Sequence, residues 1–453
     1  MSPGQVLPRF EPAGWCRPVA LVQPGTNLAA PLAPSVAVEA DVLGTDPVTL
    51  SLVSGNVTLT GSYDATLGLV VTTGSITTRH ASRRSGRPDA PVEAVGLALT
   101  GTHLSVFTRE AGAWTVRGRV DLTDRVATHD EAWLAGLTHH VTGPAGAVRA
   151  GAFGQLGLRD LRLVSHADGS PWREQGTAGE RFLLTATSAG PGFFDTAHTS
   201  VWSLDPRLLA LEHRSDIFFR RPDRSGVFGD HASHLVRDGD RWLLATSTWG
   251  DFEQSAPDAS VEVTLAETST DLTHGRHVLD TRALPLPTTG LRSVGVWDPH
   301  LVRTDEGWLV AYVSARRFFR FHPVLAGGPA LDDLTLLGAA SDRRSTEGPV
   351  LARLDDLDGR GSRWRVLASD GRDGRPGQRA RYPVLDVAPG RTPERGLVEV
   401  GALNAPYPTN ISWPTLLEEQ DGWLMIGFDG TPHGGRLVGY GSHGRVVFAR
   451  AQR

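Results

Sequence analysis

Residues 294–315, VGVWDPHLVRTDEGWLVAYVSA, decide the fold expected for this chain. Asp298 and Pro299 precede an apolar pair, a polar turn follows, and Trp308 begins a second apolar run. This pattern predicts two short antiparallel strands, with an acidic side chain near the start of the first strand. The same pattern recurs along the chain, so this hairpin is one copy of a repeat.

Four other copies share the apolar pair and the aromatic start of the second strand. They begin at Asp160 (DLRLV, then RFLLTATS with Phe182), Ala232 (ASHLV, then RWLLATS with Trp242), Glu347 (EGPVL, then RWRVLASDG with Trp364) and Trp413 (WPTLL, then GWLMIGFDG with Trp423). Such units cannot bury both faces alone and pack against their neighbours. Radial packing of the copies predicts a five-bladed β-propeller, and steps of 72, 66, 49 and 66 residues leave room for four strands and long loops in each blade.

The chain before the repeats has a different rhythm. Residues 19–155 alternate polar and apolar positions over short runs separated by glycine and asparagine turns, which predicts a β-sandwich. Residues 1–18 are rich in proline and predict an N-terminal arm. The expected fold class is therefore all-β, with an N-terminal β-sandwich (jelly roll) followed by a five-bladed β-propeller over residues 156–453 that carries the catalytic site.

Composition excludes several functional classes. The net charge is −5 and the chain contains a single cysteine, Cys16, so nucleic acid is not the expected partner and no intrachain disulfide or cysteine metal cluster can form. No run approaches the ~18 apolar residues of a membrane span, so no membrane partner is expected. The N-terminus shows no charged leader and apolar core, which predicts a soluble cytoplasmic protein unless an export signal has been removed.

Aligning the first residues of the five copies gives one column of a propeller mouth: Asp160, Ala232, Asp298, Glu347 and Trp413. Three of these five residues are carboxylic acids. Held around a narrow mouth, like charges raise one another's pKa. One acid kept protonated and one left ionised is the pair that glycoside cleavage requires.

A structural interpretation competes with this chemical one. Asp-Pro is a common turn element at the start of a strand, and Glu-Gly-Pro can form a solvated loop. A single match of this length would be weak, whereas three acids in one register column favour the chemical interpretation.

The residues also resemble a known family. Asp160 in the first repeat, Trp-Asp-Pro (297–299) in the third and Thr-Glu-Gly-Pro (346–349) in the fourth are similar to motifs of the five-bladed propeller glycosidases, nearest glycoside hydrolase family 43 and its relatives. The resemblance covers residues 157–453 and implies that Asp160 is the general base, Asp298 tunes pKa and orients the acid, and Glu347 is the general acid. Asp160 is not followed by the usual proline, so Asp230 and Asp195 remain substitutes for the base.

Two departures from the family pattern matter. In family 43 an extra sandwich often follows the propeller, whereas here it precedes the propeller. The related fructosyl-transferring families have Arg-Asp-Pro and Glu-Cys, whereas this chain has Trp-Asp-Pro and Thr-Glu-Gly. The resemblance therefore favours the inverting group and implies a furanoside or pentoside of arabinose, xylose or fructose. The sandwich weakly resembles concanavalin-like or laminin-G-like domains, and its role is either carbohydrate binding or shaping the neighbouring cleft.

Further polar and aromatic residues lie in the loops at the predicted blade mouths, where binding residues tend to sit. The candidate substrate-binding residues are Asp195, His231, Trp249, Trp297, Arg316, His322, Asp370, Asn410 and Trp413. Structural interpretations compete here too, because recurring tryptophans are usually core and lone histidines in β loops are usually structural.

No metal-ligand spacing is present, so no metal or cofactor is expected to be required; the resemblance leaves room for a structural calcium ion on the propeller axis. The leading hypothesis is a glycoside hydrolase with a carbohydrate substrate. The alternatives are a non-catalytic carbohydrate-binding propeller, or a glycosyl-transferring or phosphorylase relative, for which Arg316, Arg317, Arg379 and Arg381 are the only residues that suggest a phosphate pocket.

Overall fold

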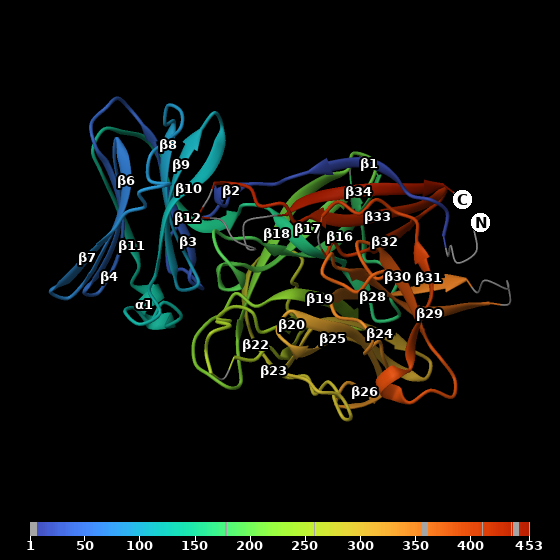
Figure 1. Ribbon diagram of the computed structural model, residues 1–453. Coiled ribbons are helices and arrows are strands. Elements are labelled where there is room, and N and C mark those ends of the chain that lie inside the picture. Colours follow the sequence, from blue (N-terminus) through green and yellow to red (C-terminus); the bar gives the residue numbers. More distant parts are fainter. Residues whose placement is uncertain are drawn as a thin grey trace.

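The structure, a computed structural model, describes residues 7–176, 179–257, 259–355, 361–409, 411–435, 437 and 444–452. It is an all-β protein with two groups of sheets (Figure 1). Two facing sheets, here called the N-terminal sheet pair, lie at the left of the view. The remaining five sheets form the larger body at the right.

The N-terminal sheet pair is formed by residues 20–155. One sheet has the order β10-β9-β8-β3-β12-β2 and the other the order β11-β4-β5-β6-β7. The strands are β2 (Ala20–Val22), β3 (Ser35–Val42), β4 (Val48–Ser54), β5 (Val57–Asp64), β6 (Thr66–Thr73), β7 (Ile76–His80), β8 (Ala94–Thr100), β9 (His103–Glu110), β10 (Ala113–Asp121), β11 (Thr138–Thr142) and β12 (Ala145–Gln155), with helix α1 (Glu131–Ala135) before β11. β4 alternates buried and half-buried residues because only one of its faces meets the apolar core between the sheets.

The five remaining sheets are each built mainly from consecutive strands. The first has β13 (Leu158–Leu163), β15 (Arg173–Gly176), β16 (Gly179–Ser188), β17 (His198–Asp205), β18 (Ala210–Arg220) and β22 (Gly275–Asp280); the second has β14 (Ser165–His166), β19 (His231–Asp238), β20 (Arg241–Ser247), β21 (Val263–Thr268) and β23 (Arg282–Ala283). The third has β24 (Gly295–Thr304), β25 (Gly307–Arg317), β26 (Arg320–Ala330) and β27 (Asp333–Ala339); the fourth has β28 (Thr346–Asp355), β29 (Ser362–Asp370), β30 (Tyr382–Val387) and β31 (Leu397–Leu403). The fifth has β32 (Thr415–Glu419), β33 (Gly422–Asp429), β34 (Arg445–Gln452) and β1 (Glu11–Cys16); short 3₁₀ helices occupy Phe194–Thr196 and Pro393–Arg395. The strands β14, β22 and β1 join their sheets out of chain order.

The predicted hairpins are confirmed. Residues 295–317 form the antiparallel strands β24 and β25, with Thr304 opposite Gly307 at the turn. The other copies form the antiparallel pairs β13–β16, β19–β20, β28–β29 and β32–β33. The centre of β24 is buried without alternation, as expected for a strand covered on both faces.

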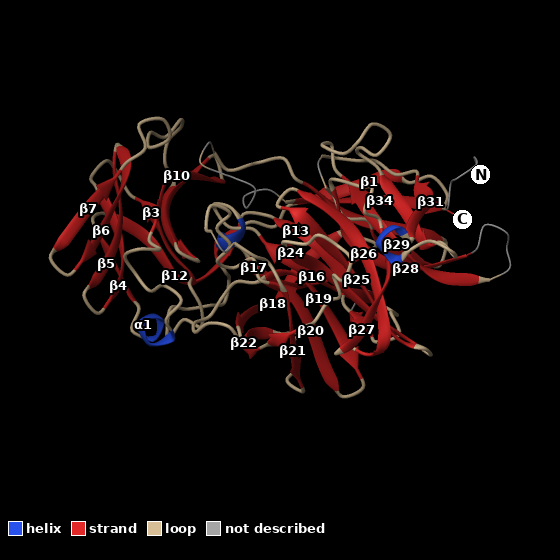
Figure 2. Cartoon of the chain, turned by 60° about the horizontal axis from the view of Figure 1, so that its bottom comes forward, coloured by secondary structure: helices blue, strands red, loops and turns tan. Residues whose placement is uncertain are grey.

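Five apolar cores join the five sheets in a closed ring. Four of these cores contain side chains of two consecutive sheets, and the last core joins the fifth sheet to the first and also includes side chains of the second and third sheets. Examples, in order around the ring, are Ile217 with Leu244, Leu243 with Val310, Ala311 with Leu385, Val384 with Met425, and Ile426 with Leu184. This closed ring of sheets, called the ring below, is consistent with a propeller-like fold (Figure 2).

The N-terminal arm predicted for residues 1–18 is wrong for its central part. Glu11–Cys16 is the strand β1, which pairs antiparallel to β34 and completes the fifth sheet. Paired backbone groups satisfy hydrogen bonds that an arm would leave to water. The N-terminal sheet pair is therefore inserted between a strand of the fifth sheet and the first strand of the first sheet.

Within the described residues, no helix has the length and hydropathy needed to cross a membrane.

Candidate active site

The first strands of four sheets each contain a β-bulge at the same point. In β13, β19, β24 and β28 the register shifts across the residue pairs 159/162, 231/234, 297/300 and 347/350. The first extra residue of each bulge has a positive φ: 54° at Asp160, 60° at Ala232, 57° at Asp298 and 61° at Gly348. Bulges re-aim side chains and recur beside active sites, and aspartate tolerates this backbone conformation better than most residues.

These bulges correct the predicted alignment. Asp160 and Asp298 are equivalent, as predicted, but the equivalent residue of the fourth sheet is Gly348 rather than Glu347. Glu347 is equivalent to Arg159, His231 and Trp297. The prediction matched the first acidic letter of each copy, whereas Pro299 and Pro349, which follow the bulge residues, show the true register.

Despite this offset, Asp160, Asp298 and Glu347 share one site. Asp160 is 5% and Asp298 is 3% exposed, and Glu347 is half-buried. Burial raises the pKa of all three carboxyl groups. The charge of Asp160 raises the pKa of Asp298 further, and the charges of both aspartates raise the pKa of Glu347.

Asp160 has the most cationic surroundings of the three. The Arg159 Nε lies 3.2 Å from its Oδ2, and the charges of Arg159 and Arg162 and a hydrogen bond from Thr187 oppose the rise of its pKa that burial causes. Arg159 also donates to the Nε2 of His231 at 3.2 Å, while the Nδ1 of His231 donates to the Gly229 carbonyl at 3.0 Å. This arrangement keeps His231 neutral, because burial lowers its pKa well below the usual value. Asp160 is thus the carboxyl group best placed to stay ionised.

Asp298 connects the third sheet to the fourth. Its Oδ2 accepts a hydrogen bond from the backbone N–H of Gly348 at 3.2 Å, and its own N–H donates to the Ser247 hydroxyl at 3.0 Å. The charge of Arg162 lowers the pKa of Asp298, but burial and Asp160 outweigh that effect and hold the pKa well above the usual value. The charge of Asp160 therefore acts on Asp298, and the charge of Asp298 acts on Glu347.

Glu347 combines partial exposure with the least cationic surroundings. Burial raises its pKa most, followed by the charges of Asp298 and Asp160, while the neighbouring Trp297 indole and the more remote Arg159 lower it. The pKa of Glu347 consequently lies well above the usual value. A carboxyl group that keeps its proton near neutral pH and retains solvent contact can donate that proton to a ligand.

The interior of the ring below the bulges is held by Arg162 and two histidines. Arg162 donates to the carbonyl oxygens of Pro349 at 2.6 Å and Asp298 at 2.9 Å, and its guanidinium lies 4.4 Å from the Trp413 ring centroid. His234 and His300 stack with centroids 4.1 Å apart, and each Nδ1 accepts a hydrogen bond from the next sheet, from Leu301 and Leu351 respectively. These links fix the relative heights of the inner strands.

A calcium ion on the axis does not fit these side chains. Calcium prefers six to eight oxygen ligands, whereas the groups found here are a guanidinium and two imidazoles with strongly lowered pKa values, that of His234 being about 3. Burial lowers the pKa of Arg162 only to about 10, so its charge persists at neutral pH and opposes a metal cation. Within the part of the chain that the structure describes, no group of three or more His, Cys, Asp or Glu residues could hold a metal ion.

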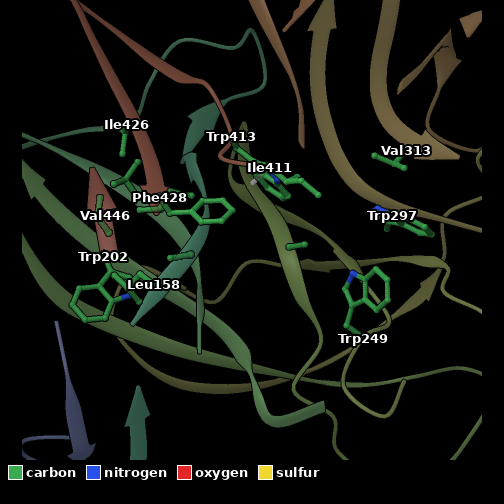
Figure 3. Close-up of a cluster of buried hydrophobic side chains, with 14 of the residues drawn as sticks. Leu158, Trp202, Trp249, Trp297, Val313, Ile411, Trp413, Ile426, Phe428 and Val446 are labelled. Carbon is green, nitrogen blue, oxygen red and sulfur yellow. The ribbon is translucent and has the colours of Figure 1, made fainter. Parts of the chain in front are cut away.

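Four of the predicted binding residues lie around the acids. His231 contacts Arg159, and Trp297 lies beside Glu347. Trp249 packs on Trp297 with centroids 5.2 Å apart, and Figure 3 shows these two indoles side by side, with Trp413 on the adjacent wall. All three tryptophans belong to one buried apolar cluster, so in this structure their rings are packed as core.

The other predicted binding residues have different partners, although Asp370 is adjacent to Ser369, the residue opposite Glu347 in the β28–β29 pair. Asp195 faces the N-terminal sheet pair, with its Oδ2 2.6 Å from the His103 Nδ1. Arg316 donates to the Ser341 carbonyl, His322 is buried with a pKa lowered to about 4 by burial, and Asp370 pairs with Arg343 and accepts from Thr346 at 2.6 Å. Asn410 lies outside the described residues.

Sequence reasoning missed Arg159 and Arg162. Both are fully buried, and they supply the cationic groups closest to the acids. A signal was present, because two arginines flank Asp160 in LRDLRL, a strand that is otherwise apolar and therefore unlike a solvated one. A buried arginine requires acidic or carbonyl partners, and these could have been sought in the equivalent positions of the other repeats.

No protein-family model matches the chain, and no curated protein matches its sequence. Among solved structures, the GH43_1 enzyme from Xanthomonas citri complexed with xylose is similar, with a TM-score of 0.41 at 14% identity over 65% of this chain and 87% of that chain. An alpha-L-arabinofuranosidase from Lactobacillus brevis gives a TM-score of 0.42 at 11% identity over 65% and 91%, respectively. A family 117 glycoside hydrolase from Zobellia galactanivorans gives 0.40 at 11% identity over 65% and 84%. These values are too low to assign an activity, so the function is inferred from the chain's own carboxyl groups.

Proposed function

We propose that this protein is a glycoside hydrolase that cleaves furanoside or pentoside linkages with inversion, on a five-bladed β-propeller preceded by a β-sandwich. The observation that supports this proposal is the set of three carboxyl groups at the bulges, in which the charge of Asp160 raises the pKa of Asp298 and the charges of both raise the pKa of Glu347, while the nearest arginine pairs only with Asp160. Two carboxyl groups whose surroundings separate their pKa values are the requirement for acid and base catalysis of glycoside cleavage.

The surroundings suggest the role of each acid. Glu347, with a raised pKa and solvent contact, donates its proton to the leaving oxygen. Asp160, beside Arg159, stays ionised and takes a proton from the attacking water. Asp298 is held in place by the Gly348 N–H, and together with Asp160 it disfavours ionisation of Glu347 and so keeps the pKa of Glu347 high. In a single displacement the water attacks the anomeric carbon on the face opposite the leaving group, which inverts the configuration.

Three of the four arginines that suggested a phosphate pocket have other partners. Arg316 and Arg379 donate to the carbonyl oxygens of Ser341 and Gly374, and Arg381 pairs with Glu399. These contacts leave the hydrolytic proposal better supported than a phosphorolytic one.

The test compares Glu347→Gln with the wild type on two kinds of substrate. The panel contains arabino-, xylo- and fructo-oligosaccharides, and 2,4-dinitrophenyl glycosides of the same sugars, whose leaving groups depart without a proton. We expect Glu347→Gln to lose about 10²–10⁴-fold in kcat/KM on the oligosaccharide that the wild type cleaves, because a general acid contributes about that much. The loss on the matching dinitrophenyl glycoside should be far smaller.

The matched control is Glu306→Gln, at an exposed glutamate in the turn between β24 and β25, which should leave both rates unchanged. Equal rates for wild type and Glu347→Gln on every cleaved oligosaccharide would contradict the role of Glu347. An NMR spectrum that shows the product first formed with the anomeric configuration of the substrate would contradict inversion.

A further inference from the structure

A cavity of about 1110 Å³ lies between the N-terminal sheet pair and the ring. Its lining comes from the ends of β9 and β10 and the segment leading into α1 on one side, and from loops of the first three sheets on the other. We propose that this cavity, called the inter-sheet cleft below, binds a neutral oligosaccharide chain close to the carboxyl groups. The proposal rests on the function proposed above and adds to it the substrate class and the role of the sheet pair.

The walls of the inter-sheet cleft are held by polar contacts between the two bodies. His103 pairs with Asp195 at 2.6 Å, and Arg119 donates to the Pro191 carbonyl at 3.0 Å. Two further contacts lie on the other side: the His129 Nδ1 donates to the Val227 carbonyl at 2.7 Å, and Glu131 pairs with Arg220 at 2.7 Å. Because the sheet pair is also joined to the ring at both of its ends, through β1 and β13, the cleft exists before a ligand binds. A preformed cleft lowers the entropic cost of binding.

Aromatic rings line this cleft at its rim and on its inner wall. Phe193 and Phe319 are 53% and 57% exposed and come from different loops, one before the 3₁₀ helix at Phe194–Thr196 and one from the turn between β25 and β26. Single exposed apolar residues are common on protein surfaces, but two exposed phenylalanines that line the same cavity are unusual, because both leave apolar surface in contact with water. Aromatic side chains with a few convergent polar groups are typical of ligand sites, and flat apolar faces of sugar rings pack on such rings.

The inner wall connects the cleft to the acids. Phe194 lines the cavity and stacks on Trp249 with centroids 4.4 Å apart and an interplanar angle of 18°. Trp249 packs on Trp297 at 5.2 Å, and Trp297 lies beside Glu347. A row of packed aromatic side chains therefore lies between the cleft and the carboxyl group proposed as the acid, so the cleft and the acid are close neighbours.

The charge of the lining selects against anionic sugars. Asp121 on the sheet pair and Glu253 on the ring accept hydrogen bonds from Thr123 and Ser255 rather than from an arginine, and these bonds lower both pKa values. The charge of Asp121 acts on Glu253, so the two carboxylates lie near each other although they belong to different bodies. Uronate or sulfate groups would meet like charges here, whereas hydroxyl groups can donate to these carboxylates.

One imidazole in the lining also offers a free acceptor. Because the His129 Nδ1 carries its proton toward Val227, and because burial lowers the pKa of this histidine, its Nε2 has a lone pair at neutral pH. That Nε2 is buried and has no hydrogen-bond partner among the described residues. The cavity volume exceeds the ~300–1,000 Å³ typical of small-ligand pockets, so a chain of several sugars fits it better than a single sugar does.

The test measures binding without cleavage, in the Glu347→Gln background, by calorimetric titration with arabinohexaose, xylohexaose, a fructo-hexaose and, as the anionic probe, hexagalacturonate. The added change is Phe193→Ala with Phe319→Ala, and the matched control is Ile76→Ala with Leu208→Ala, two exposed apolar residues outside the lining. We expect at least one neutral hexaose to bind, its affinity to fall at least tenfold in the phenylalanine double variant, and no change in the control. Hexagalacturonate should bind at least tenfold more weakly, and Asp121→Asn with Glu253→Gln should narrow that difference.

Three results would overturn the proposal: no neutral hexaose binds, the phenylalanine variant binds as tightly as the control, or hexagalacturonate binds as tightly as the neutral chains. Melting temperatures of all variants show that each is folded. Binding is read without turnover, so the two proposals fail separately. If the wild type cleaves a substrate but the phenylalanine variant binds as tightly as the control, only the hydrolase proposal stands. If the phenylalanine variant loses affinity but the wild type cleaves no substrate, only the proposal for the inter-sheet cleft stands.

Discussion

Buried carboxyl groups occupy two kinds of surroundings in the ring. Asp230 and Asp370 are completely buried, and each carboxylate meets an arginine directly: Arg221 donates to both oxygens of Asp230, and Arg343 donates to both oxygens of Asp370. Asp298 is nearly as deeply buried, yet its carboxylate accepts a hydrogen bond from the Gly348 N–H rather than from an arginine, and its charged neighbours include another acid. Buried carboxylates are therefore paired with arginine at Asp230 and Asp370, whereas the buried carboxyl groups at the bulges lie close to other acids.

This difference separates structural from functional carboxyl groups. A buried ion pair with both partners present costs little net stability, whereas an unneutralised buried carboxyl group shifts its pKa instead of ionising. Asp216 is the strongest example of a buried carboxylate stabilised by its partners. Burial raises its pKa, but hydrogen bonds from His198 and His213 hold the pKa well below the usual value. The acids of this cluster therefore carry an unfavourable arrangement that the fold retains, as active sites commonly do.

The largest contrast is expected at Asp230, the residue that the sequence offered as a substitute for the base. Asp230→Asn should lower the free energy of unfolding by about 3 kcal/mol, because it leaves the buried Arg221 guanidinium with only Asp251 as an acidic partner. Chemical denaturation measures this change. The activity per folded molecule should stay close to that of the wild type, since both oxygens of Asp230 already have donors. If Asp230→Asn instead loses most of its kcat while its stability is unchanged, Asp230 has a catalytic role.

The opposite effect on stability is expected at Asp298. Its folded-state pKa lies above its unfolded value, so its contribution to stability is present at low pH and is lost as the pH rises through the folded-state pKa. Asn cannot ionise and can still accept from the Gly348 N–H. Asp298→Asn should therefore become more stable than the wild type as the pH rises above about 4, the unfolded value for aspartate, by about 1.4 kcal/mol for each unit of pKa shift. Melting curves between pH 4 and 8 measure the gap, and a gap that does not widen with pH would show that Asp298 is already neutralised.

The smallest expected effect concerns Arg159. This guanidinium is the first of the groups that lower the pKa of Asp160 against burial, and lysine cannot reproduce its contacts with both Asp160 and His231. In Arg159→Lys the pKa of Asp160 should rise, so the acidic limb of the kcat/KM profile should move to higher pH. Arg303→Lys, at an exposed arginine paired with Asp238, should leave the profile unchanged. If the acidic limb of the profile does not move in Arg159→Lys, Asp160 is not the general base.

The sequence predicted the hairpins and much of the acid cluster for definite physical reasons. Each copy carries an apolar pair and an aromatic residue at fixed spacing, and repetition of that local pattern reports strand pairing directly. The offset at Glu347 escaped because a bulge adds one residue to a strand without leaving a composition signal, apart from the proline that follows it. The strand β1 was not predicted because its partner β34 is about 430 residues away, and the sequence of a short exposed strand has no periodicity that indicates a distant partner.

The surroundings of the acids were even less readable. Arg159 and Arg162 occur in an apolar strand, but only the packed ring shows that one contacts His231 and the other the carbonyl oxygens of two sheets. Asp370 and His322 were singled out by residue type alone, and the structure places the first in an ion pair and the second in a buried position. Long-range packing decides such cases, and a single sequence does not encode it in any local pattern.

The pairing of β1 with β34 sets an order for biosynthesis. β1 is synthesised about 430 residues before its partner β34, so it pairs only after the strands of the first four sheets of the ring have been made, and the fifth sheet is completed after them. Until then the nascent chain exposes the apolar flanks of the first and fourth sheets, and the unpaired edge of β34 can recruit another chain as it emerges. Chaperone dependence during translation, and domain-swapped dimers when synthesis is fast, are the cellular consequences we expect from this one backbone pairing.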